Sequence, residues 1–336
     1  MLRRRWDGGI QIFMAWVVPR VGVDNESMEE RPTSCRRTSQ RAAMSAMPPD
    51  LTLAWLLGAL DVAEVVNIEP MRGSSTSELH RVTVRSAGDA QMRVVVRRYV
   101  LADVLAESLD IVSHEVKALR LAASAAVPTP TVLAADAPGE QADVPTVIMS
   151  WLEGRPRWES KDRRRFLIDL VDAMIAVSAV KVPSDVSVRP ISGYTQNSYD
   201  PPRWATRPVV WRRAVEIFHG PTPITDLCFV HRDFHPGNVL WNRSQLTGLV
   251  DWQSACIGPS SIEPGHCRLN MLYYDPDMAE ELRTIWEQRA QRIYDPWADV
   301  IAIVGMLDPM RKPKNPSKSR MAIEDTLARA VADLSG

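Results

Sequence analysis

The chain has 336 residues, of which 45% are hydrophobic and 24% are charged, so it is long enough for two packed domains or one two-lobed unit. Forty Lys and Arg side chains against forty-one Asp and Glu leave a formal net charge of −1, without the basic excess that binding a phosphate backbone requires. No apolar run reaches the roughly 18 to 20 residues that cross a bilayer. We therefore expect neither a nucleic acid nor a membrane as a main partner.

The cysteine and histidine content argues against disulfides and against zinc. Four Cys residues without a C-x-x-C spacing do not form a disulfide framework, which favours a reducing cytoplasmic location. His231 and His235 have a zinc-ligand spacing for a helix, but Pro236-Gly237 interrupts any such helix. The Cys side chains are therefore interpreted as small buried apolar groups. The sequence carries no feature that predicts an oligomeric state.

The first ordered elements are predicted to follow a long irregular segment. Residues 1–49 have no periodic pattern and are predicted to be a disordered extension. Asp50 is a predicted N-cap, and helical apolar spacing continues to Val65. Apolar and β-branched residues over 79–84 and 92–99, separated by turn residues, then predict a β-hairpin.

The rest of the chain changes from mixed to mainly helical patterns. One amphipathic helix is predicted over 103–124, and strands are predicted over 131–135 and 146–151. From Asp162 onward the pattern is mostly helical. An antiparallel sheet with one helix, followed by a helical half, predicts an α+β fold with two lobes.

A polar cluster stands out in the second half of the chain. Residues 229–241 read Phe-Val-His-Arg-Asp-Phe-His-Pro-Gly-Asn-Val-Leu-Trp. Pro-Gly forbids a continuous helix, so Asp233 and Asn238 are predicted to lie on a loop that folds back. Asp251 follows a short apolar strand. A carboxylate that can accept a hydroxyl proton, together with an amide oxygen and a carboxylate suited to Mg²⁺, is the set that phosphoryl transfer requires.

The spacing His231-x-Asp233-x-x-x-x-Asn238, followed by Asp251, resembles the catalytic and metal-binding core of the kinase-like fold. The segment His-Arg-Asp-Phe-His-Pro-Gly-Asn is more similar to the aminoglycoside phosphotransferase family than to protein kinases. The resemblance implies that His231 buttresses the loop and that Asp233 positions the acceptor hydroxyl. It implies that Asn238 and Asp251 hold Mg²⁺.

The resemblance also implies the organisation of the fold and a nucleotide site. It implies a bilobal protein-kinase-like fold, with an N-lobe over 50–148 and a hinge and helical C-lobe over 149–336. A small-residue loop between two strands resembles the family's phosphate-covering loop, because backbone N–H groups and hydroxyls can approach phosphate oxygens there. The candidates in it are Gly73, Ser74, Ser75 and Thr76. The motif G-x-x-x-x-G-K-[ST] is absent from the sequence, which excludes a P-loop NTPase.

Arg97 stands where kinases place a Lys on the nucleotide phosphates. Arginine keeps the charge and can bind phosphate with two hydrogen bonds, but it is bulkier than lysine. Neighbours on a strand face opposite sides, so the alternatives Arg97 and Arg98 stay open. The resemblance implies an ion pair between Arg97 and Glu115, while His114 and Lys117 are expected to face solvent.

The predicted strand over 146–151, with Leu152-Glu153-Gly154 after it, resembles the hinge that meets the adenine edge, which makes Met149, Ser150 and Trp151 candidate nucleotide contacts. The sequence thus predicts an ATP- and Mg²⁺-dependent enzyme that phosphorylates a hydroxyl of a small molecule, such as an aminoglycoside-like, macrolide, sugar or choline-like acceptor. One alternative is a protein kinase, although Asp251-Trp252 lacks the Gly of D-F-G. The other is a non-catalytic, pseudokinase-like nucleotide-binding module, which Arg97 and the glycine-poor loop favour.

Overall fold

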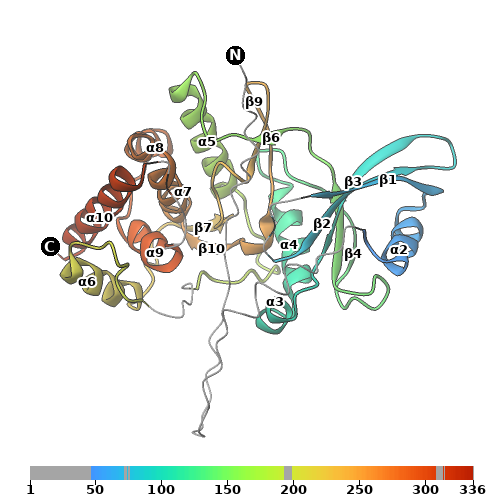
Figure 1. The fold of residues 1–336 in the computed structure, drawn as a ribbon, viewed down its shortest axis with the longest axis horizontal. Helices are drawn as coiled ribbons and strands as arrows, with labels where there is room; N and C mark the ends of the chain where they lie inside the picture. The colour runs from blue at the N-terminus through green and yellow to red at the C-terminus, as the bar shows by residue number, and fades with distance from the viewer. Residues whose placement is uncertain are drawn as a thin grey trace, which may run out of the picture. The chain divides into compact units, whose positions relative to one another are not determined.

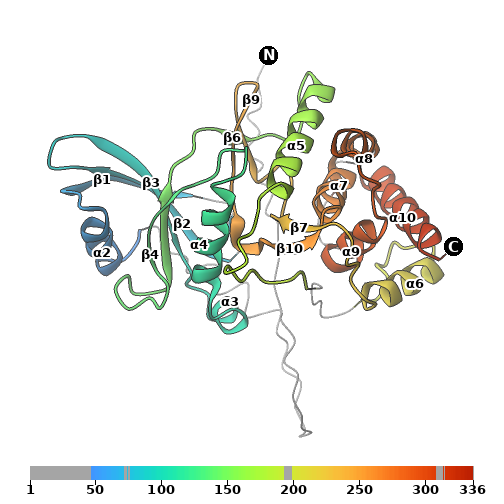
Figure 2. The same cartoon turned by 180° about the vertical axis from the view of Figure 1, so that it is seen from behind.

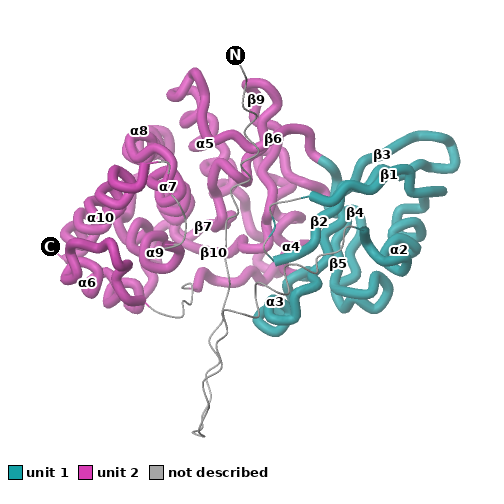
Figure 3. The backbone as a smooth tube through the Cα atoms, in the orientation of Figure 1, with its two compact units in different colours: residues 1–113, 132–151 teal, residues 114–131, 152–336 magenta. Residues whose placement is uncertain are grey.

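The computed structural model describes residues 47–71, 74, 76–192, 199–307, 313 and 315–335. The extension predicted over residues 1–49 lies outside this part except for its last three residues. The described chain forms two compact units (Figure 3). Unit 1 takes the described residues up to Ser113 together with Val132–Trp151, and unit 2 takes His114–Thr131 together with the described residues from Leu152 onward. An antiparallel sheet early in the chain and helices late in it confirm the α+β prediction.

Unit 1 is built on an antiparallel sheet. In the described residues, the strand order across this sheet is β1 (Glu64–Met71), β2 (Glu78–Arg85), β3 (Gln91–Arg98), β5 (Thr146–Ser150) and β4 (Val132–Asp136). The unit also contains α2 (Asp50–Leu60) and α3 (Ala102–Glu107), whereas α4 (Ile111–Ala122) begins in unit 1 and continues in unit 2.

Helix α2 covers one face of the sheet (Figure 1). Its Leu56 packs against sheet residues that are fully buried, namely Val82, Val84, Val94, Val96 and Ile148. Because side chains alternate along a strand, the residues between these valines lie on the opposite face of the sheet. Arg97, which follows Val96, lies on that opposite face as well.

Two helix predictions are corrected by the structure. The first helix ends at Leu60, because Asp61 adopts a left-handed conformation with φ of 50° and its N–H bonds to the carbonyl of Gly58 at 3.3 Å. Val65 therefore lies in β1. The helix predicted over 103–124 is two helices, α3 and α4, because Ser108 and Asp110 bond to each other at 3.4 Å and their polar side chains compete with helical backbone bonds. Asp50 is the first residue of its helix rather than the N-cap, which is Pro49.

Unit 2 combines two small antiparallel sheets with a group of helices (Figure 2). One sheet pairs β10 (Cys256–Pro259) with β7 (Leu227–Val230), and the other has the order β6 (Arg155–Pro156), β8 (Val239–Asn242) and β9 (Gln245–Leu249). The helices are α5 (Arg163–Ser178), α6 (Pro208–Phe218), α7 (Ile262–Tyr274), α8 (Pro276–Ala290), α9 (Trp297–Met306) and α10 (Pro316–Asp333), with a 3₁₀ turn η1 (Trp252–Ser254) before β10. Among the described residues of both units, no helix has the length and apolar composition that a membrane span requires.

Helix α7 is the centre of unit 2, because every residue from Ile262 to Tyr273 is buried. It packs against α8 and α9. At Gly265, an added Cβ would lie 2.8 Å from the Cβ of Ala298 on α9, so the two helices approach too closely for any larger residue. A buried ion pair joins the same helices: Arg268 bonds to Asp299 through Nε at 3.0 Å and through Nη2 at 3.2 Å.

We expect Arg268→Met to lower the free energy of unfolding of unit 2 by about 3–5 kcal/mol, because the substitution leaves the carboxylate of Asp299 buried without its charge partner. Arg213 is the matched control, since it lies half-exposed on α6 in a surface pair with Glu216. Arg213→Met should change the same free energy by less than about 1 kcal/mol. Urea unfolding of both variants measures this difference, and equal losses would contradict the assignment.

Candidate active site

The predicted catalytic residues lie on one loop of unit 2, between β7 and β8. Both flanking strands are paired, β7 with β10 and β8 with β9, so the two ends of the loop are held by different sheets. The loop closes on itself through the Asn238 N–H, which bonds to the carbonyl of His235 at 2.9 Å. The Val250 N–H bonds to the carbonyl of Asn238 at 3.0 Å and ties the loop to the segment that carries Asp251.

Asp233 and Asn238 are in direct contact. The Asn238 side chain donates from Nδ2 to Oδ2 of Asp233 at 3.0 Å and to the backbone carbonyl of Asp233 at 2.9 Å. Two acceptors on one side assign the nitrogen end of this amide. Its oxygen end is therefore turned away from Asp233 and is the end that suits a hard cation.

His231 lies under the loop and is fully buried. Its Nδ1 accepts the Asp233 N–H at 3.2 Å, so the ring proton lies on Nε2, which donates to the carbonyl of Val250 at 3.0 Å. The ring also meets Trp252 edge-on, with centroids 4.6 Å apart. Burial lowers the pKa of His231, which favours the neutral ring. The ring links the backbone of Asp233 to that of Val250, the residue before Asp251.

Asp251 follows β9 and precedes η1, in a left-handed backbone conformation with φ of 72°. Arg232 has a similar φ of 67°. Residues other than glycine adopt this conformation only where their surroundings stabilise it, and such positions gather at functional sites. Burial raises the pKa of Asp233, and the charge of Asp251 raises it further.

Glu263, in the first turn of α7, holds the start of the catalytic loop. Its carboxylate accepts the backbone N–H groups of His231 and, at 3.2 Å, of Arg232. No sequence motif singles out Glu263. Residues 32 positions apart share no local pattern, and only a carboxylate near the start of a helix could have drawn attention to it.

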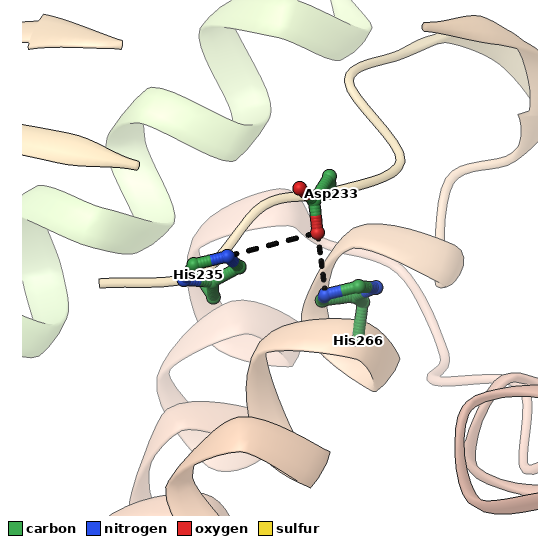
Figure 4. Close-up of side chains that lie close together, drawn as sticks. All are labelled: Asp233, His235 and His266. Carbon is green, nitrogen blue, oxygen red and sulfur yellow. Dashed lines mark ion pairs between the residues drawn. The ribbon is translucent and has the colours of Figure 1, made fainter. Parts of the chain in front are cut away.

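Two further rings surround the carboxylate of Asp233 (Figure 4). Nε2 of His266, from α7, lies 3.1 Å from Oδ1 of Asp233, and Nε2 of His235 lies 3.6 Å from the same oxygen. The zinc-type spacing of His231 and His235 does not produce a shared site, because the ring of His231 is engaged with Asp233 N–H and Val250 instead.

Of the described cysteines, Cys256 and Cys267 are buried and Cys228 is partly buried, and all three are interpreted as core groups. Burial raises the pKa of the Cys256 thiol to about 11 and that of the Cys228 thiol to about 12, and it raises the pKa of Cys267 as well.

Unit 1 carries the predicted nucleotide residues on one face of its sheet. In the strand register, Arg97 pairs with Val147, and Val95 pairs with Met149, so Arg97 and Met149 lie on the face opposite α2. Trp151 continues this alternation after β5, and the guanidinium of Arg81 lies 5.0 Å from its ring centre.

Arg98 is occupied within the sheet, which separates it from Arg97. Its guanidinium bonds to Glu78 at 2.6 Å and to Asp143 at 3.0 Å, and it lies on the side of the sheet that α2 covers. Of the two alternatives, Arg97 is therefore the candidate for phosphate contact.

The loop between β1 and β2 is described in part. Ser74 Oγ accepts the N–H of Thr76 at 3.3 Å and that of Ser77 at 3.1 Å, which forms a tight hydroxyl-based turn. Gly73 and Ser75, the other two candidates of this loop, lie outside the described residues.

Helix α4 carries the remaining predicted residues. Glu115 is buried in the part of α4 that belongs to unit 2, whereas Arg97 belongs to unit 1, so their ion pair stays a prediction. The expectation that His114 faces solvent is wrong: its ring is buried, with Nε2 lying 2.8 Å from the carbonyl of Ala255. Lys117 is exposed, as expected.

We expect the Glu263→Gln variant to change how stability depends on pH. Burial raises the pKa of Glu263 from 4.5 to about 8, so between these values the folded chain binds the proton more tightly than the unfolded chain. The contribution of Glu263 to stability therefore falls as pH rises through this window. The unfolding free energy of the native chain minus that of Glu263→Gln should fall from about pH 5 to about pH 8, by at most about 1.4 kcal/mol per pH unit. A difference that is flat or rises with pH would contradict this.

Comparisons with known proteins agree with this geometry. The model of the phosphotransferase enzyme family, APH, matches residues 77–300. The solved structure of the aminoglycoside phosphotransferase APH(4)-Ia is 17% identical, with a TM-score of 0.56 over 85% of this chain and 99% of that one. A thermostable mutant of that enzyme, in a ternary complex with ADP and hygromycin B, is 16% identical, with a TM-score of 0.55 over 84% of this chain and 99% of that one.

The ternary complex of APH(2″)-IIa with streptomycin and ATP is 13% identical, with a TM-score of 0.51 over 77% of this chain and 89% of that one. No curated protein matches the chain. At these identities the structural neighbours establish the fold, while the family model covers the catalytic loop and more than half of the sequence. The chain therefore belongs to the phosphotransferase enzyme family and has the kinase-like fold of the aminoglycoside phosphotransferases.

Proposed function

We propose that this protein is an ATP- and Mg²⁺-dependent O-phosphotransferase that moves the γ-phosphate to a hydroxyl group of a small molecule. The observation that carries the proposal is the contact of Asn238 Nδ2 with Asp233 Oδ2, which joins a buried carboxylate to an amide whose oxygen end is turned outward. Such chemistry depends mainly on positioning and on neutralising charge, and a rigid loop of this kind can supply both.

In this proposal Asp233 orients the acceptor hydroxyl and takes its proton late in the reaction. The raised pKa of Asp233 suits that role, because a stronger base accepts the proton more readily. The donor set of an amide oxygen from Asn238 and a carboxylate from Asp251 is the kind that Mg²⁺ prefers. Mg²⁺, when bound, would neutralise charge on the nucleotide phosphates.

Unit 1 would bind the nucleotide. Arg97, on the sheet face opposite α2, would contact phosphate oxygens, and the loop that carries Ser74 and Thr76 would lie against them. The same face carries Met149 and Trp151, whose apolar surfaces suit an adenine ring. Glu115 would pair with Arg97 and orient it.

The acceptor class is left broad: aminoglycoside-like, macrolide, sugar or choline-like. Structural neighbours include complexes with hygromycin B and streptomycin, which makes hydroxyl-rich antibiotics the first compounds to test. The helical region offers both carboxylates and arginines, such as Asp277, Glu280, Arg283 and Arg289, without a strong excess of either charge. We expect the enzyme in the cytoplasm, where ATP is available.

The function is tested by incubating the native chain with Mg²⁺, ATP and a panel of hydroxylated metabolites and antibiotics while ADP release is measured. Acceptor-dependent ADP release, with phosphate found on the acceptor by mass spectrometry, would support the proposal. Phosphate transfer to proteins but not to small molecules would favour a protein kinase. Nucleotide binding without turnover across the panel would favour the pseudokinase-like alternative.

Asp233→Asn should reduce kcat by about a hundredfold or more, because the amide cannot accept the proton, while the affinity for ATP and Mg²⁺ stays within about threefold. The control is Asp226→Asn, the same chemical change at an exposed position before β7. It should leave kcat unchanged. Initial rates and calorimetric nucleotide titrations measure the two effects, and equal rates in the two variants would remove Asp233 from the mechanism.

Asp251→Asn should raise the Mg²⁺ concentration needed for half-maximal activity by about tenfold or more, because a neutral amide is a weaker ligand than a carboxylate for a hard cation. Titration of Mg²⁺ at saturating ATP measures this, with Asp226→Asn again as the control. An unchanged Mg²⁺ requirement with normal kcat would show that Asp251 is not a metal ligand.

A further inference from the structure

His266 was not assigned a role by sequence reasoning, yet its ring nitrogen is closer to the Asp233 carboxylate than that of His235. Nε2 of His266 lies 3.1 Å from Oδ1, against 3.6 Å for Nε2 of His235. The two imidazoles stack with centroids 5.8 Å apart and planes within 14° of parallel, and Trp158 stacks on His235 in turn. Figure 4 shows both rings reaching toward Asp233, one from the catalytic loop and one from α7.

The backbone indicates which nitrogen of His235 carries the proton. The Gly237 N–H donates to Nδ1 of His235 at 3.0 Å, which requires a lone pair on Nδ1 and therefore places the proton of the neutral ring on Nε2. An Nε2–H group attracts the Asp233 carboxylate. His231 follows the same pattern, with Nδ1 as acceptor and Nε2 as donor.

The same three side chains have the spacing of a metal-ligand set, since their ligand atoms lie within 4.8 Å of one another. A neutral histidine that coordinates through Nε2 carries its proton on Nδ1. At His235 a proton on Nδ1 would point at the Gly237 N–H and prevent their hydrogen bond. At His235 the geometry therefore favours a protonated Nε2 turned towards the carboxylate over coordination of a metal.

Helix α7 supports the loop at two points on one face. Glu263 binds the backbone N–H groups of His231 and Arg232, and His266, three residues later on the same face, reaches the side chain of Asp233. Close packing at Gly265 against α9 fixes where Glu263 and His266 lie along the axis of α7. One helix thus contacts both the backbone of the loop and the carboxylate of Asp233.

We propose that His266 is a positioning residue whose Nε2–H attracts Oδ1 of Asp233 across their 3.1 Å contact, so that Oδ2, shared with Asn238, faces the acceptor hydroxyl. The inference rests on the proposed function only in naming Asp233 as the proton acceptor; the contact itself does not depend on it. His266 touches neither acceptor nor nucleotide in this arrangement and acts through Asp233.

The kinetic test compares two variants of similar volume. His266→Gln keeps an N–H donor near the position of Nε2, and His266→Met does not. We expect His266→Met to lower kcat by about 10- to 100-fold with the KM for ATP within about twofold, and His266→Gln to recover kcat to within about fivefold of the native chain. A role in packing alone would affect the two variants alike, so equal losses of kcat, or a loss expressed only in the KM for ATP, would overturn the proposal.

A second measurement needs no acceptor and separates this inference from the proposed function. In ¹⁵N-histidine NMR of the untagged chain, the ring signals report which nitrogen carries the proton, and His219→Ala, which removes an exposed ring at the end of α6, controls for assignment. We expect a protonated Nε2 at His266 and at His235, and a shift of the His266 signal in Asp233→Asn. A bare Nε2 at His266, or a shift of both rings on adding ZnCl₂ that His266→Gln abolishes, would overturn the proposal in favour of a metal site.

Discussion

The candidate site depends on the contact between the buried side chain of Glu263 and the backbone of His231 and Arg232. This side chain binds two successive backbone N–H groups at the point where β7 ends, and one of these belongs to Arg232, whose φ is 67°. A left-handed arginine is unfavourable by itself, so an interaction worth more than the strain must stabilise it. Two buried hydrogen bonds to one carboxyl group are strong enough to do so. The direction in which the next residue, Asp233, leaves the strand follows from that turn.

This arrangement also explains why the pKa of Glu263 is raised although two donors face it. Burial removes the water that would solvate the charge, and the nearby charge of Asp233 opposes ionisation, whereas the two N–H groups favour it. The first effect is the largest. Burying Glu263 therefore costs free energy, and the chain tolerates this cost at the position that holds the backbone of the loop. Such costs are common near functional sites.

The sequence predicted the local elements better than the contacts between distant segments. The loop that carries His231, Asp233 and Asn238 was predictable because these residues fall within eight consecutive positions and Pro-Gly forbids a helix among them. The α+β class followed from the change of apolar period. The partners of the loop on α7 were not predictable, since no periodicity connects residues 31 and 32 positions apart. His114 was misjudged for a related reason: helical spacing identifies a polar position but not the carbonyl of Ala255 that meets it.

The alternation of side chains along β3 distinguishes Arg97 from Arg98, which the sequence alone left as equivalent candidates. Val94 and Val96 are buried under α2, and Arg98 shares their face, where Glu78 and Asp143 neutralise it. Arg97 must then lie on the other face, with Met149 beside it in the register. A register shift of one residue would exchange the two arginines, so the burial of these valines determines which arginine shares the sheet face of Met149.

Helix α7 joins stability to chemistry because its polar residues are buried on more than one face. Glu263 and His266 face the catalytic loop, while Arg268 bonds to Asp299 on α9 and to the Ala279 carbonyl on α8. Apolar contacts alone would let the helix slide or rotate at modest cost, whereas the hydrogen bonds of Glu263 and Arg268 are lost by a small displacement. The same helix position therefore satisfies the core ion pair and presents both groups to the loop. The position of Asp233 in the candidate site is thus tied to the position of α7, through the contacts of Glu263 and His266 with the loop.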